Sequence, residues 1–220
     1  MIIASVSENL TVEKRISITP EIAKKYISIG LEVSLPKNYA AHLGTNDSEY
    51  SDIGVIIGKD EKEILNNADI ITQLSLPSDD TCSLIKENST LIGILNPYNN
   101  ENKLKNLVKK NINVLSLELL PRITRAQSMD ILSSQANLAG YKAVIESFAH
   151  FEKAVPMMMT AAGTIPAAKV LVVGAGVAGL QAIATAKRMG AIVFATDVRM
   201  ASKEQVESLG GKFLTVEGAE

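Results

Sequence analysis

A glycine-rich turn enclosed by two apolar runs is the feature that most constrains the fold of this 220-residue chain. The run Lys169–Val173 has the length of a strand, and Gly174-Ala-Gly-Val-Ala-Gly179 follows it at once. Good helix formers continue to Met189, and a second strand-length run, 191–196, ends at Asp197. The order of strand, glycine turn, helix, strand and acid is typical of a βαβ unit that binds a dinucleotide.

Each glycine of this turn has an expected physical task. Gly174 permits the tight turn out of the strand, Gly176 lets a pyrophosphate approach the backbone, and Gly179 lets the helix pack closely against the sheet. The pyrophosphate would lie on the helix N-terminus, where unpaired N–H groups and the helix dipole offset its charge. The alternative is a structural βαβ turn that holds no ligand. The candidate cofactor-binding residues here are Gly174, Gly176, Val177, Ala178, Gly179, Asp197, Val198 and Arg199.

Asp197 indicates which dinucleotide the turn would take. It lies 18 residues after Gly179, close to the spacing of the acid that binds the adenosine ribose. Its carboxylate would accept hydrogen bonds from ribose hydroxyls and repel a 2′-phosphate, which favours NAD(H) over NADP(H). Arg199 lies on the same side if the strand continues, and it could accept a 2′-phosphate. Pairing with Asp197, or simple solvation, is the favoured interpretation of this arginine.

The first 118 residues alternate short apolar runs with helical segments. Thr19-Pro20 has the form of an N-cap followed by proline at the first helical position, and Asp60 with Glu63 has the spacing of a capping box. Glu101–Lys110 has the pattern of an amphipathic surface helix. This alternation predicts a parallel sheet of βα units. The expected strands are 2–6, 31–35, 54–57, 70–76, 91–95 and 113–117.

A long helical pattern, about Arg125–Phe151, is expected to join this region to the glycine turn. One stripe of the helix is apolar and is expected to be buried: Leu132, Ala136, Ala139, Ala143 and Ser147 or Phe148. Gln127, Asp130 and Ser133 lie on another stripe in the expected first turns, where free N–H groups favour anionic or carbonyl ligands. On spacing alone, the favoured alternative is that these three residues cap and solvate the helix.

Composition excludes several classes of function. The 22 Lys and Arg against 24 Asp and Glu give a formal charge of −2, without the basic excess usual in nucleic-acid-binding domains. The one cysteine, Cys82, permits no internal disulfide, and His42 and His150 add little toward a metal site, so we expect none. Met157–Met159 is expected to fill the core.

The sequence also predicts a soluble chain. Met1–Glu8 lacks the basic and apolar regions of a signal peptide, and prolines and glycines interrupt the apolar stretch 154–186. The predicted fold class is α/β, with two parallel-sheet domains, 1–124 and 125–220. The second would be an incomplete Rossmann fold, because only a helix, 203–209, and a strand, 212–216, follow Asp197. Exposed apolar sheet faces would then cause association, low stability, or complementation by a separate chain that supplies the second half.

Several segments resemble the NAD(H)-binding domain of the proton-translocating nicotinamide nucleotide transhydrogenases. The segments are Pro121–Gln135, Asn137–Tyr141, Pro156–Gly163, the glycine turn and Lys203–Gly211. Glu13–Pro20 is shared with that family and with the related alanine dehydrogenases. The resemblance spans essentially the whole chain and is most specific after Pro121.

The resemblance implies a function and a set of roles. NADH would pass hydride to NADP⁺ held by a separate domain, coupled to proton movement through a membrane domain. The implied partners are these NADP(H)-binding and membrane domains and a second copy in a homodimer. The implied location is cytoplasmic and peripheral to the inner membrane. Arg122, Ile123, Thr124 and Arg125 would form the loop against the dinucleotide, and Gln127, Asp130 and Ser133 would be the catalytic residues that orient the nicotinamide.

The family comparison also bears on alanine dehydrogenase activity. Hydride transfer between two nicotinamide rings needs positioning but no general acid or base. The alanine dehydrogenases use a lysine and a histidine, and Ser75 and Asn96 stand in the matching segments here. Arg15 is retained and is expected to be an ion-pair partner. We therefore expect no alanine dehydrogenase activity. A module that binds NAD(H) without transferring hydride, or a purely structural fragment, is the alternative.

Overall fold

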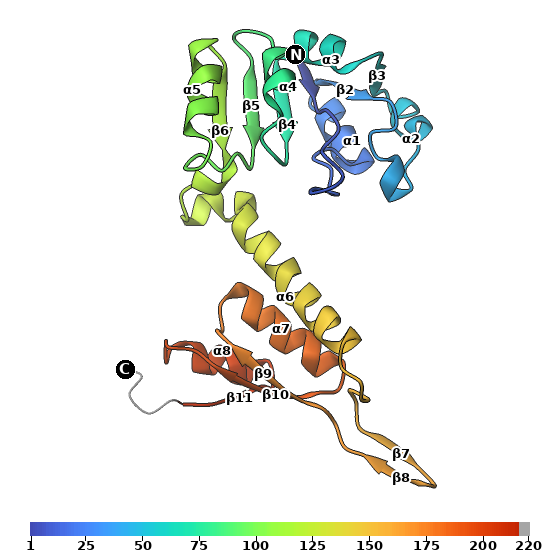
Figure 1. The fold of residues 1–220 in the computed structure, drawn as a ribbon, viewed down its shortest axis with the longest axis vertical. Helices are drawn as coiled ribbons and strands as arrows, with labels where there is room; N and C mark the ends of the chain where they lie inside the picture. Colours follow the sequence, from blue (N-terminus) through green and yellow to red (C-terminus); the bar gives the residue numbers. More distant parts are fainter. Residues whose placement is uncertain (216–220) are drawn as a thin grey trace. The chain divides into compact units, whose positions relative to one another are not determined.

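The computed structural model describes residues 1–215, which form two compact units (Figure 1). Unit 1 is Met1–Met129, and unit 2 begins at Asp130. Val216, the last residue of the expected strand 212–216, lies outside the described residues. The division into domains 1–124 and 125–220 stays a prediction.

Unit 1 contains a fully parallel sheet of six strands among the described residues, in the order β3-β2-β1-β4-β5-β6. This is the doubly wound order, in which the chain starts in the middle and builds outward in both directions. The predicted strands are confirmed with small shifts of their ends. Their bounds are β1 (Ile2–Ala4), β2 (Glu32–Pro36), β3 (Ile56–Gly58), β4 (Ile70–Gln73), β5 (Thr90–Gly93) and β6 (Asn113–Ser116).

The helices of unit 1 begin where the sequence signals them. Thr19 accepts the Ile22 N–H ahead of Pro20, and the Asp60 carboxylate accepts the Glu63 N–H. The reciprocal bond of the expected capping box is different, because the Glu63 carboxylate accepts the Lys59 N–H instead of that of Asp60. The helical segments are α1 (Pro20–Ser28), η1 (Ala41–Leu43), α2 (Asp47–Ser51), α3 (Glu61–Asn67), α4 (Asp79–Ser83), α5 (Glu101–Lys109), η2 (Leu117–Leu119) and η3 (Thr124–Met129).

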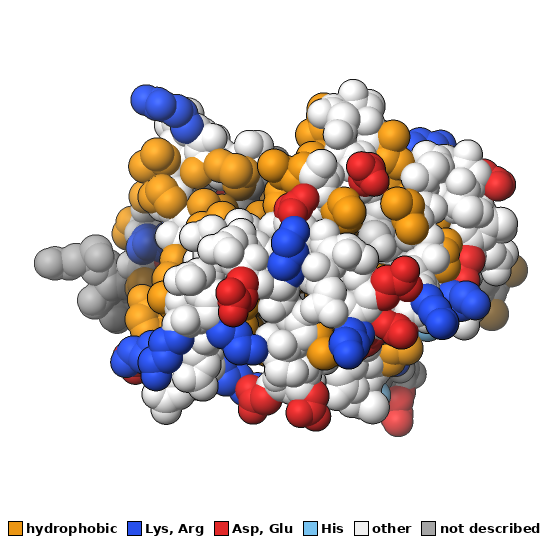
Figure 2. All heavy atoms as spheres, turned by 90° about the horizontal axis from the view of Figure 1, so that it is seen from above, with side chains coloured by type: hydrophobic (Ala, Val, Ile, Leu, Met, Phe, Trp, Pro, Cys, Tyr) orange, Lys and Arg blue, Asp and Glu red, His pale blue; other side chains and the backbone are white. Residues whose placement is uncertain are grey.

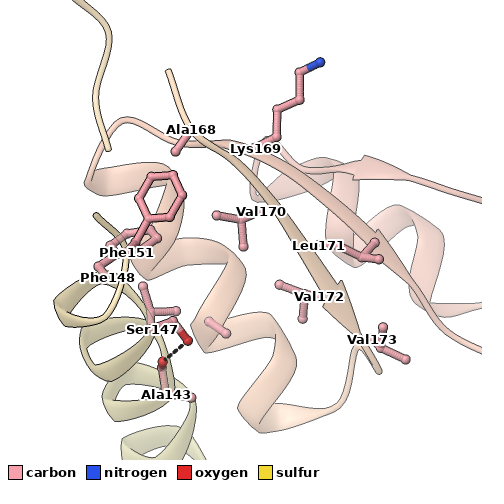
Figure 3. A pocket seen from close by; sticks show the side chains of 12 residues that line it. Ala143, Ser147, Phe148, Phe151, Ala168, Lys169, Val170, Leu171, Val172 and Val173 are labelled. Atoms are coloured by element: carbon pink, nitrogen blue, oxygen red, sulfur yellow. Dashed lines mark hydrogen bonds between the residues drawn. The ribbon is translucent and has the colours of Figure 1, made fainter. Parts of the chain in front are cut away.

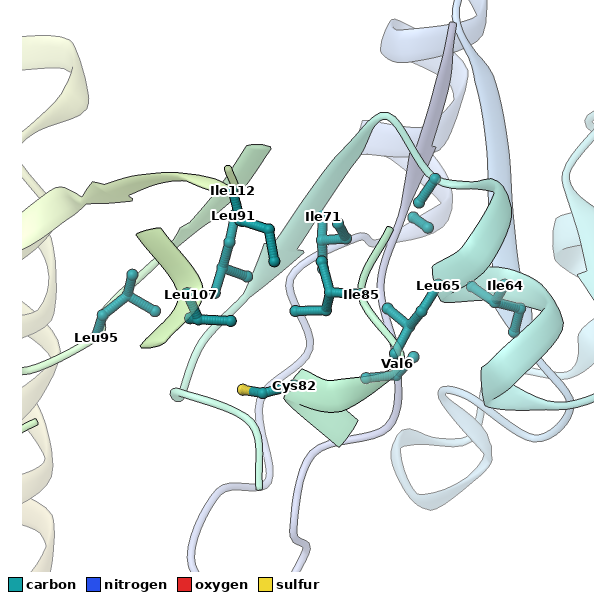
Figure 4. Close-up of a cluster of buried hydrophobic side chains, with 12 residues drawn as sticks. Val6, Ile64, Leu65, Ile71, Cys82, Ile85, Leu91, Leu95, Leu107 and Ile112 are labelled. Atoms are coloured by element: carbon teal, nitrogen blue, oxygen red, sulfur yellow. The ribbon is translucent and has the colours of Figure 1, made fainter. Parts of the chain in front are cut away.

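Two clusters of buried apolar side chains hold unit 1 together. One contains Ile71 and Leu91 from the sheet together with Leu65 of α3 and Leu107 of α5 (Figure 4). The other contains Val33 and Leu35 of β2 with side chains of α1 and α2. On the face drawn in Figure 2, cationic and anionic side chains are interspersed, in accord with the small net charge.

Unit 2 contains a shorter parallel sheet, which has the order β11-β10-β9 within the described part of the chain. This is the 3-2-1 half of the doubly wound order. An antiparallel hairpin, β7–β8, precedes it. The bounds are α6 (Ile131–Ala149), β7 (Met158–Thr160), β8 (Gly163–Ile165), β9 (Lys169–Val173), α7 (Val177–Arg188), β10 (Ile192–Thr196), α8 (Ser202–Ser208) and β11 (Lys212–Phe213).

The long helix differs from its prediction in two respects. It starts at Ile131 instead of Arg125, because Asp130 caps it and Thr124–Met129 forms a 3₁₀ segment. Its buried positions are Gly140 and Val144, with Ala136 and Phe148 partly buried. For the other members of the expected stripe the prediction of burial is wrong, because the face of α6 that contacts α7 is rotated away from that stripe. These exposed residues are Leu132, Ala139, Ala143 and Ser147.

A close contact between helices explains this rotation. A Cβ atom built at Gly140 would overlap the carbonyl oxygen of Ala178 in α7, so only glycine lets the two backbones approach so closely. The prediction for Met157–Met159 is also wrong, because these side chains are exposed on and beside the β7–β8 hairpin. Within residues 1–215, no helix is long and apolar enough to cross a membrane.

Candidate dinucleotide-binding site

The glycine turn of unit 2 has the backbone geometry expected of it. Gly174 has φ +94°, a conformation that favours glycine, and its N–H donates to the Thr196 carbonyl at 2.8 Å. A Cβ atom at Gly179 would overlap the carbonyl oxygen of Gly174. A Cβ atom at Gly176 would meet nothing within 4 Å. Gly174 and Gly179 therefore serve the close packing of the turn, while the space over Gly176 is open.

Helix α7 presents an uncapped N-terminus beside that space. Its N-cap is Gly176, which has no side chain to accept the first N–H groups, and the first intrahelical bond runs from the Leu180 N–H to the Gly176 carbonyl at 2.8 Å. Val177 is 43% exposed, so the first turn is accessible. N–H groups of a first helical turn have no intrahelical partner, and the helix dipole adds positive potential there. This geometry suits a phosphate group.

Asp197 closes the site from the end of β10. Its side chain is only 6% exposed. Oδ2 accepts the Ala175 N–H at 2.7 Å and Arg199 Nη2 at 3.1 Å, while Oδ1 accepts the backbone N–H of Arg199 at 2.8 Å and Nε at 3.0 Å. The Arg199 guanidinium, then the N–H groups of Arg199 and Ala175, hold the pKa of this carboxyl well below its ordinary range. Asp197 is therefore an anion tied to the glycine turn.

The pairing of Arg199 with Asp197, favoured from the sequence, is confirmed. Each carboxylate oxygen has about two acceptor positions, and each already receives two donors. A ribose hydroxyl can therefore donate to Asp197 only if the guanidinium moves. The Arg199 side chain is 62% exposed, so it has room to do so. Val198, between them, is 78% exposed.

The arginine loop lies in unit 1. Arg122, Ile123, Thr124 and Arg125 are all exposed, and a turn bond from the Ala126 N–H to the Ile123 carbonyl, at 2.9 Å, shapes their backbone. Gln127 is also exposed and lies in η3 instead of the expected helix.

Asp130 and Ser133 are brought together at the start of α6. The Asp130 carboxylate accepts the Ser133 N–H at 2.9 Å and the Ser133 hydroxyl at 2.7 Å. The N-cap side chain therefore uses the Ser133 N–H, which agrees with the capping interpretation that spacing alone favours for Asp130 and Ser133. Both residues are partly buried.

Sequence reasoning missed the role of the Ala175 backbone N–H. Ala175 is 1% exposed, and its N–H links the glycine turn to the end of β10. A main-chain donor carries no residue-type signal, so only the geometry of the turn could indicate it. In the region that the structure describes, no group of three or more His, Cys, Asp or Glu could hold a metal ion.

Positions that bear on alanine dehydrogenase activity lie in unit 1. Arg15 is an ion-pair partner as expected: its Nε and Nη2 contact the Glu13 carboxylate at 2.8 and 2.6 Å. Glu8 accepts the Ser75 N–H at 3.4 Å, and Glu118 accepts the Asn96 N–H at 2.5 Å.

Comparison with known proteins gives a consistent result. The family described as "Alanine dehydrogenase/PNT, N-terminal domain" matches residues 5–139, and the corresponding C-terminal domain matches 143–220. An alpha-subunit chain of the NAD(P) transhydrogenase of Rhodospirillum rubrum is 49% identical over 222 residues, covering 99% of this chain and 58% of its own. A crystal structure of transhydrogenase from Sinorhizobium meliloti superposes with a TM-score of 0.93 at 46% identity, covering 98% of this chain and 64% of that one.

An L-alanine dehydrogenase structure shares the fold, with a TM-score of 0.84 at 18% identity over 99% of this chain and 61% of that one. The chain thus spans about 58% of the length of the Rhodospirillum relative.

Proposed function

The chain belongs to the alanine dehydrogenase/PNT family, and from this premise we propose that it is the NAD(H)-binding component of a transhydrogenase. The observation that carries the proposal is the turn of unit 2, where the open space over Gly176, the uncapped start of α7 and the Asp197 carboxylate lie together. The 49% identity to a transhydrogenase subunit supports it.

The residues of unit 2 have distinct tasks in this proposal. The N–H groups at Val177 and Ala178, beside the open space over Gly176, would hold the pyrophosphate. Asp197 binds the adenosine ribose once Arg199 moves aside, and Val198 borders that sugar. The fixed negative charge of Asp197 disfavours a 2′-phosphate, so the cofactor of this chain is NAD(H), and NADP(H) belongs to the partner domain.

When bound, NADH would supply the hydride, and the residues of this chain would hold the nicotinamide in position for the transfer. Arg122, Ile123, Thr124 and Arg125 form the loop against the dinucleotide. Gln127, Asp130 and Ser133 orient the nicotinamide and its carboxamide. The mutual hydrogen bonds of Asp130 and Ser133 fix their rotamers, which suits a role in orientation. No proton is taken up or released in transfer between two nicotinamides, so no general acid or base is required.

The remaining elements of the proposal concern assembly. The chain works as a homodimer, in contact with the NADP(H)-binding and membrane domains that couple transfer to proton translocation. It lies at the cytoplasmic face of the inner membrane and is held there by those partners. The 39–49% identities to transhydrogenase alpha subunits support this assignment.

Titration with NADH, followed by its fluorescence, tests cofactor binding. The decisive variant is Gly176→Ala. Its Cβ atom would meet no protein atom within 4 Å, so we expect the fold to be kept. The added methyl group would occupy the space through which the proposed pyrophosphate approaches the backbone. We expect its affinity to fall at least about tenfold, the equivalent of about 1.4 kcal/mol. Arg188→Ala, at the far end of α7, is the control and should bind like the wild type. Equal affinity of all three proteins contradicts the proposed site.

A second candidate function is a module that binds NAD(H) without transferring hydride. Reconstitution with an NADP(H)-binding partner domain separates the two: transfer from NADH to an NADP⁺ analogue supports the enzyme, and cofactor binding without transfer supports the module. Formation of NADH from alanine and NAD⁺ by the pure chain would contradict both.

A further inference from the structure

A pocket with charged walls lies between α4 and α5 in unit 1. Its volume is about 400 Å³, which is within the usual range for sites that bind small molecules. Unit 2 has a pocket of similar size between α6 and β9, but that one is lined mainly by apolar side chains such as Phe148, Val170 and Val172 (Figure 3). The α4–α5 pocket has cationic side chains in its lining, which includes Asp79, Cys82, Lys103, Asn106, Leu107 and Lys110.

The two cations come from one side of α5. Lys103, Asn106 and Lys110, the C-cap of the helix, are spaced by three and four residues and so follow one face. The two lysines are seven residues apart, which is about 10 Å along the helix axis. Lys105 and Lys109 of the same helix are not among the described residues that line the pocket. The pocket therefore has two ammonium groups about two turns apart, with an amide side chain between them.

Both ammonium groups contact α4, and both contacts are weak. Lys103 Nζ lies 3.2 Å from Asp79 Oδ1, and the Asp79 side chain is 77% exposed. Lys110 Nζ donates to the Ser83 carbonyl at 3.3 Å. A solvated ion pair and a long hydrogen bond to a neutral carbonyl each contribute little to stability. An anionic ligand can therefore replace either contact at a small cost in free energy.

The wall of the pocket between the two lysines includes apolar surface. Cys82 and Leu107 line it and belong to a buried cluster of unit 1 (Figure 4). Burial raises the pKa of the Cys82 thiol, and the charges of Lys103 and Lys110 lower it by smaller amounts. Both cations thus act on the same buried wall. A ligand that fits this arrangement has apolar atoms in its middle and negative charge at its ends.

We propose that the α4–α5 pocket binds an elongated dicarboxylate, with one carboxylate on Lys103, the other on Lys110 and a short apolar chain against Leu107. The Asn106 amide donates to one of the carboxylates. The site belongs to unit 1 and uses none of the residues proposed to bind NAD(H), so it stands apart from the proposed function.

Two features select a dicarboxylate among anions. A compact anion such as inorganic phosphate cannot reach both ends of a site in which the cations are about 10 Å apart along the helix. A molecule with two phosphates would bring close to four negative charges to two cations. Two carboxylates match Lys103 and Lys110 one for one.

An NMR titration of the nitrogen-15-labelled 220-residue chain tests the proposal at low ionic strength. The probe is adipate, in which a short methylene chain joins two carboxylates. Adipamide is the uncharged analogue of the same length, and inorganic phosphate is the compact anion. We expect adipate to cause saturable shifts of the amide signals of α4 and α5. Its affinity should exceed that of adipamide and of phosphate at least about tenfold, because its bonds to both lysines are charge-assisted.

Matched variants of α5 make the test specific. Lys103→Gln and Lys110→Gln each remove one ammonium group from the pocket, and Lys105→Gln and Lys109→Gln make the same change to net charge outside it. We expect the first pair to lower adipate affinity at least about fivefold and the second pair to change it less than about twofold. Asp79→Asn frees Lys103 from its competitor and should raise the affinity about twofold or more.

The outcomes of the titration are distinct. Saturable shifts in α4 and α5 that weaken with Lys103→Gln and Lys110→Gln and strengthen with Asp79→Asn support the dicarboxylate site. The proposal is overturned by the absence of saturable shifts, by equal affinity for adipate and phosphate, or by equal losses in all four lysine variants. The same spectra report whether each variant is folded.

Discussion

The two sheets of this chain start in the same way and differ in what flanks their first strand. In unit 1, β1 has neighbours on both sides, and Ile3 at its centre is 3% exposed. In unit 2, β9 has β10 on one side, and Leu171 at its centre is 58% exposed. Both strands are short apolar runs. The burial of a strand residue is thus decided by the elements around it, and not by its own sequence.

The largest expected effect is the difference in lost stability between an alanine substitution in β1 and one in β9. Ile3→Ala should destabilise unit 1 by about 2–5 kcal/mol, as deletion of a fully packed side chain does. Leu171→Ala should cost unit 2 about 0.5 kcal/mol or less, because its side chain is largely solvated. Denaturant-dependent hydrogen exchange reports the two units separately. Equal costs would mean that β9 is packed as fully as β1, which would end the comparison.

A second prediction compares two glycines of the turn. Gly179→Ala should destabilise unit 2 by about 1–3 kcal/mol, because its Cβ atom meets the Gly174 carbonyl. Gly176→Ala should leave unit 2 as stable as the wild type. Hydrogen exchange of α7 and β10 is the measurement, with unit 1 as the internal reference. A stable Gly179→Ala protein would show that the turn has room to relax.

A third prediction concerns acid. The pKa of Asp197 is lowered in the folded state, so its contribution to stability is complete above its ordinary pKa of 3.8 and is lost as the pH falls below it. Asp197→Asn should therefore destabilise unit 2 more at about pH 7 than at about pH 3. Thermal unfolding across this range is the measurement. An effect of Asp197→Asn on the free energy of unfolding that is equal at the two pH values would contradict the assignment.

The smallest effect is expected in unit 1 at Glu8. Burial raises the pKa of Glu8, and hydrogen bonds from the N–H groups of Leu74 and Ser75 lower it by a smaller amount. A raised pKa means that the stabilising contribution is present below the ordinary value of 4.5 and is lost as the pH rises through the folded-state value. Glu8→Gln keeps the acceptor oxygen, so unit 1 should gain about 0.5 kcal/mol or less at neutral pH. Denaturant melts across this range test it, and a loss of stability at neutral pH would be the contrary result.

Local signals made much of the fold predictable. The glycine turn, its flanking strands and the caps at Thr19 and Asp60 depend on neighbours within a few residues, so the sequence contains them. The same holds for Gly174 and Gly179, whose backbone conformation and contacts match their expected packing tasks, while the phosphate-binding task of Gly176 stays a prediction. The alternation of strands and helices likewise predicts the parallel sheet of unit 1.

Other features depend on contacts that are distant in the sequence. The buried face of α6 is set by the approach of Gly140 to Ala178, which apolar periodicity does not contain. The start of α6 depends on competition between a longer helix and the Asp130 cap, and the cap prevails. The link from the Ala175 N–H to Asp197 joins residues 22 positions apart. In the candidate site the residue types were predictable, but their hydrogen-bond partners were not.

In the proposed function, the guanidinium that pairs with Asp197 makes entry of the cofactor's ribose an exchange reaction. A sugar that reaches this carboxylate gains hydrogen bonds only to the extent that they exceed the contacts that Arg199 gives up. The affinity of Asp197 for the ribose thus depends on the difference between two free energies, that of the sugar's hydrogen bonds to the carboxylate and that of the Arg199 contacts. Added salt weakens the exposed arginine more than a neutral hydroxyl, so NADH should compete better at the ribose end as ionic strength rises, even while its pyrophosphate is bound more weakly.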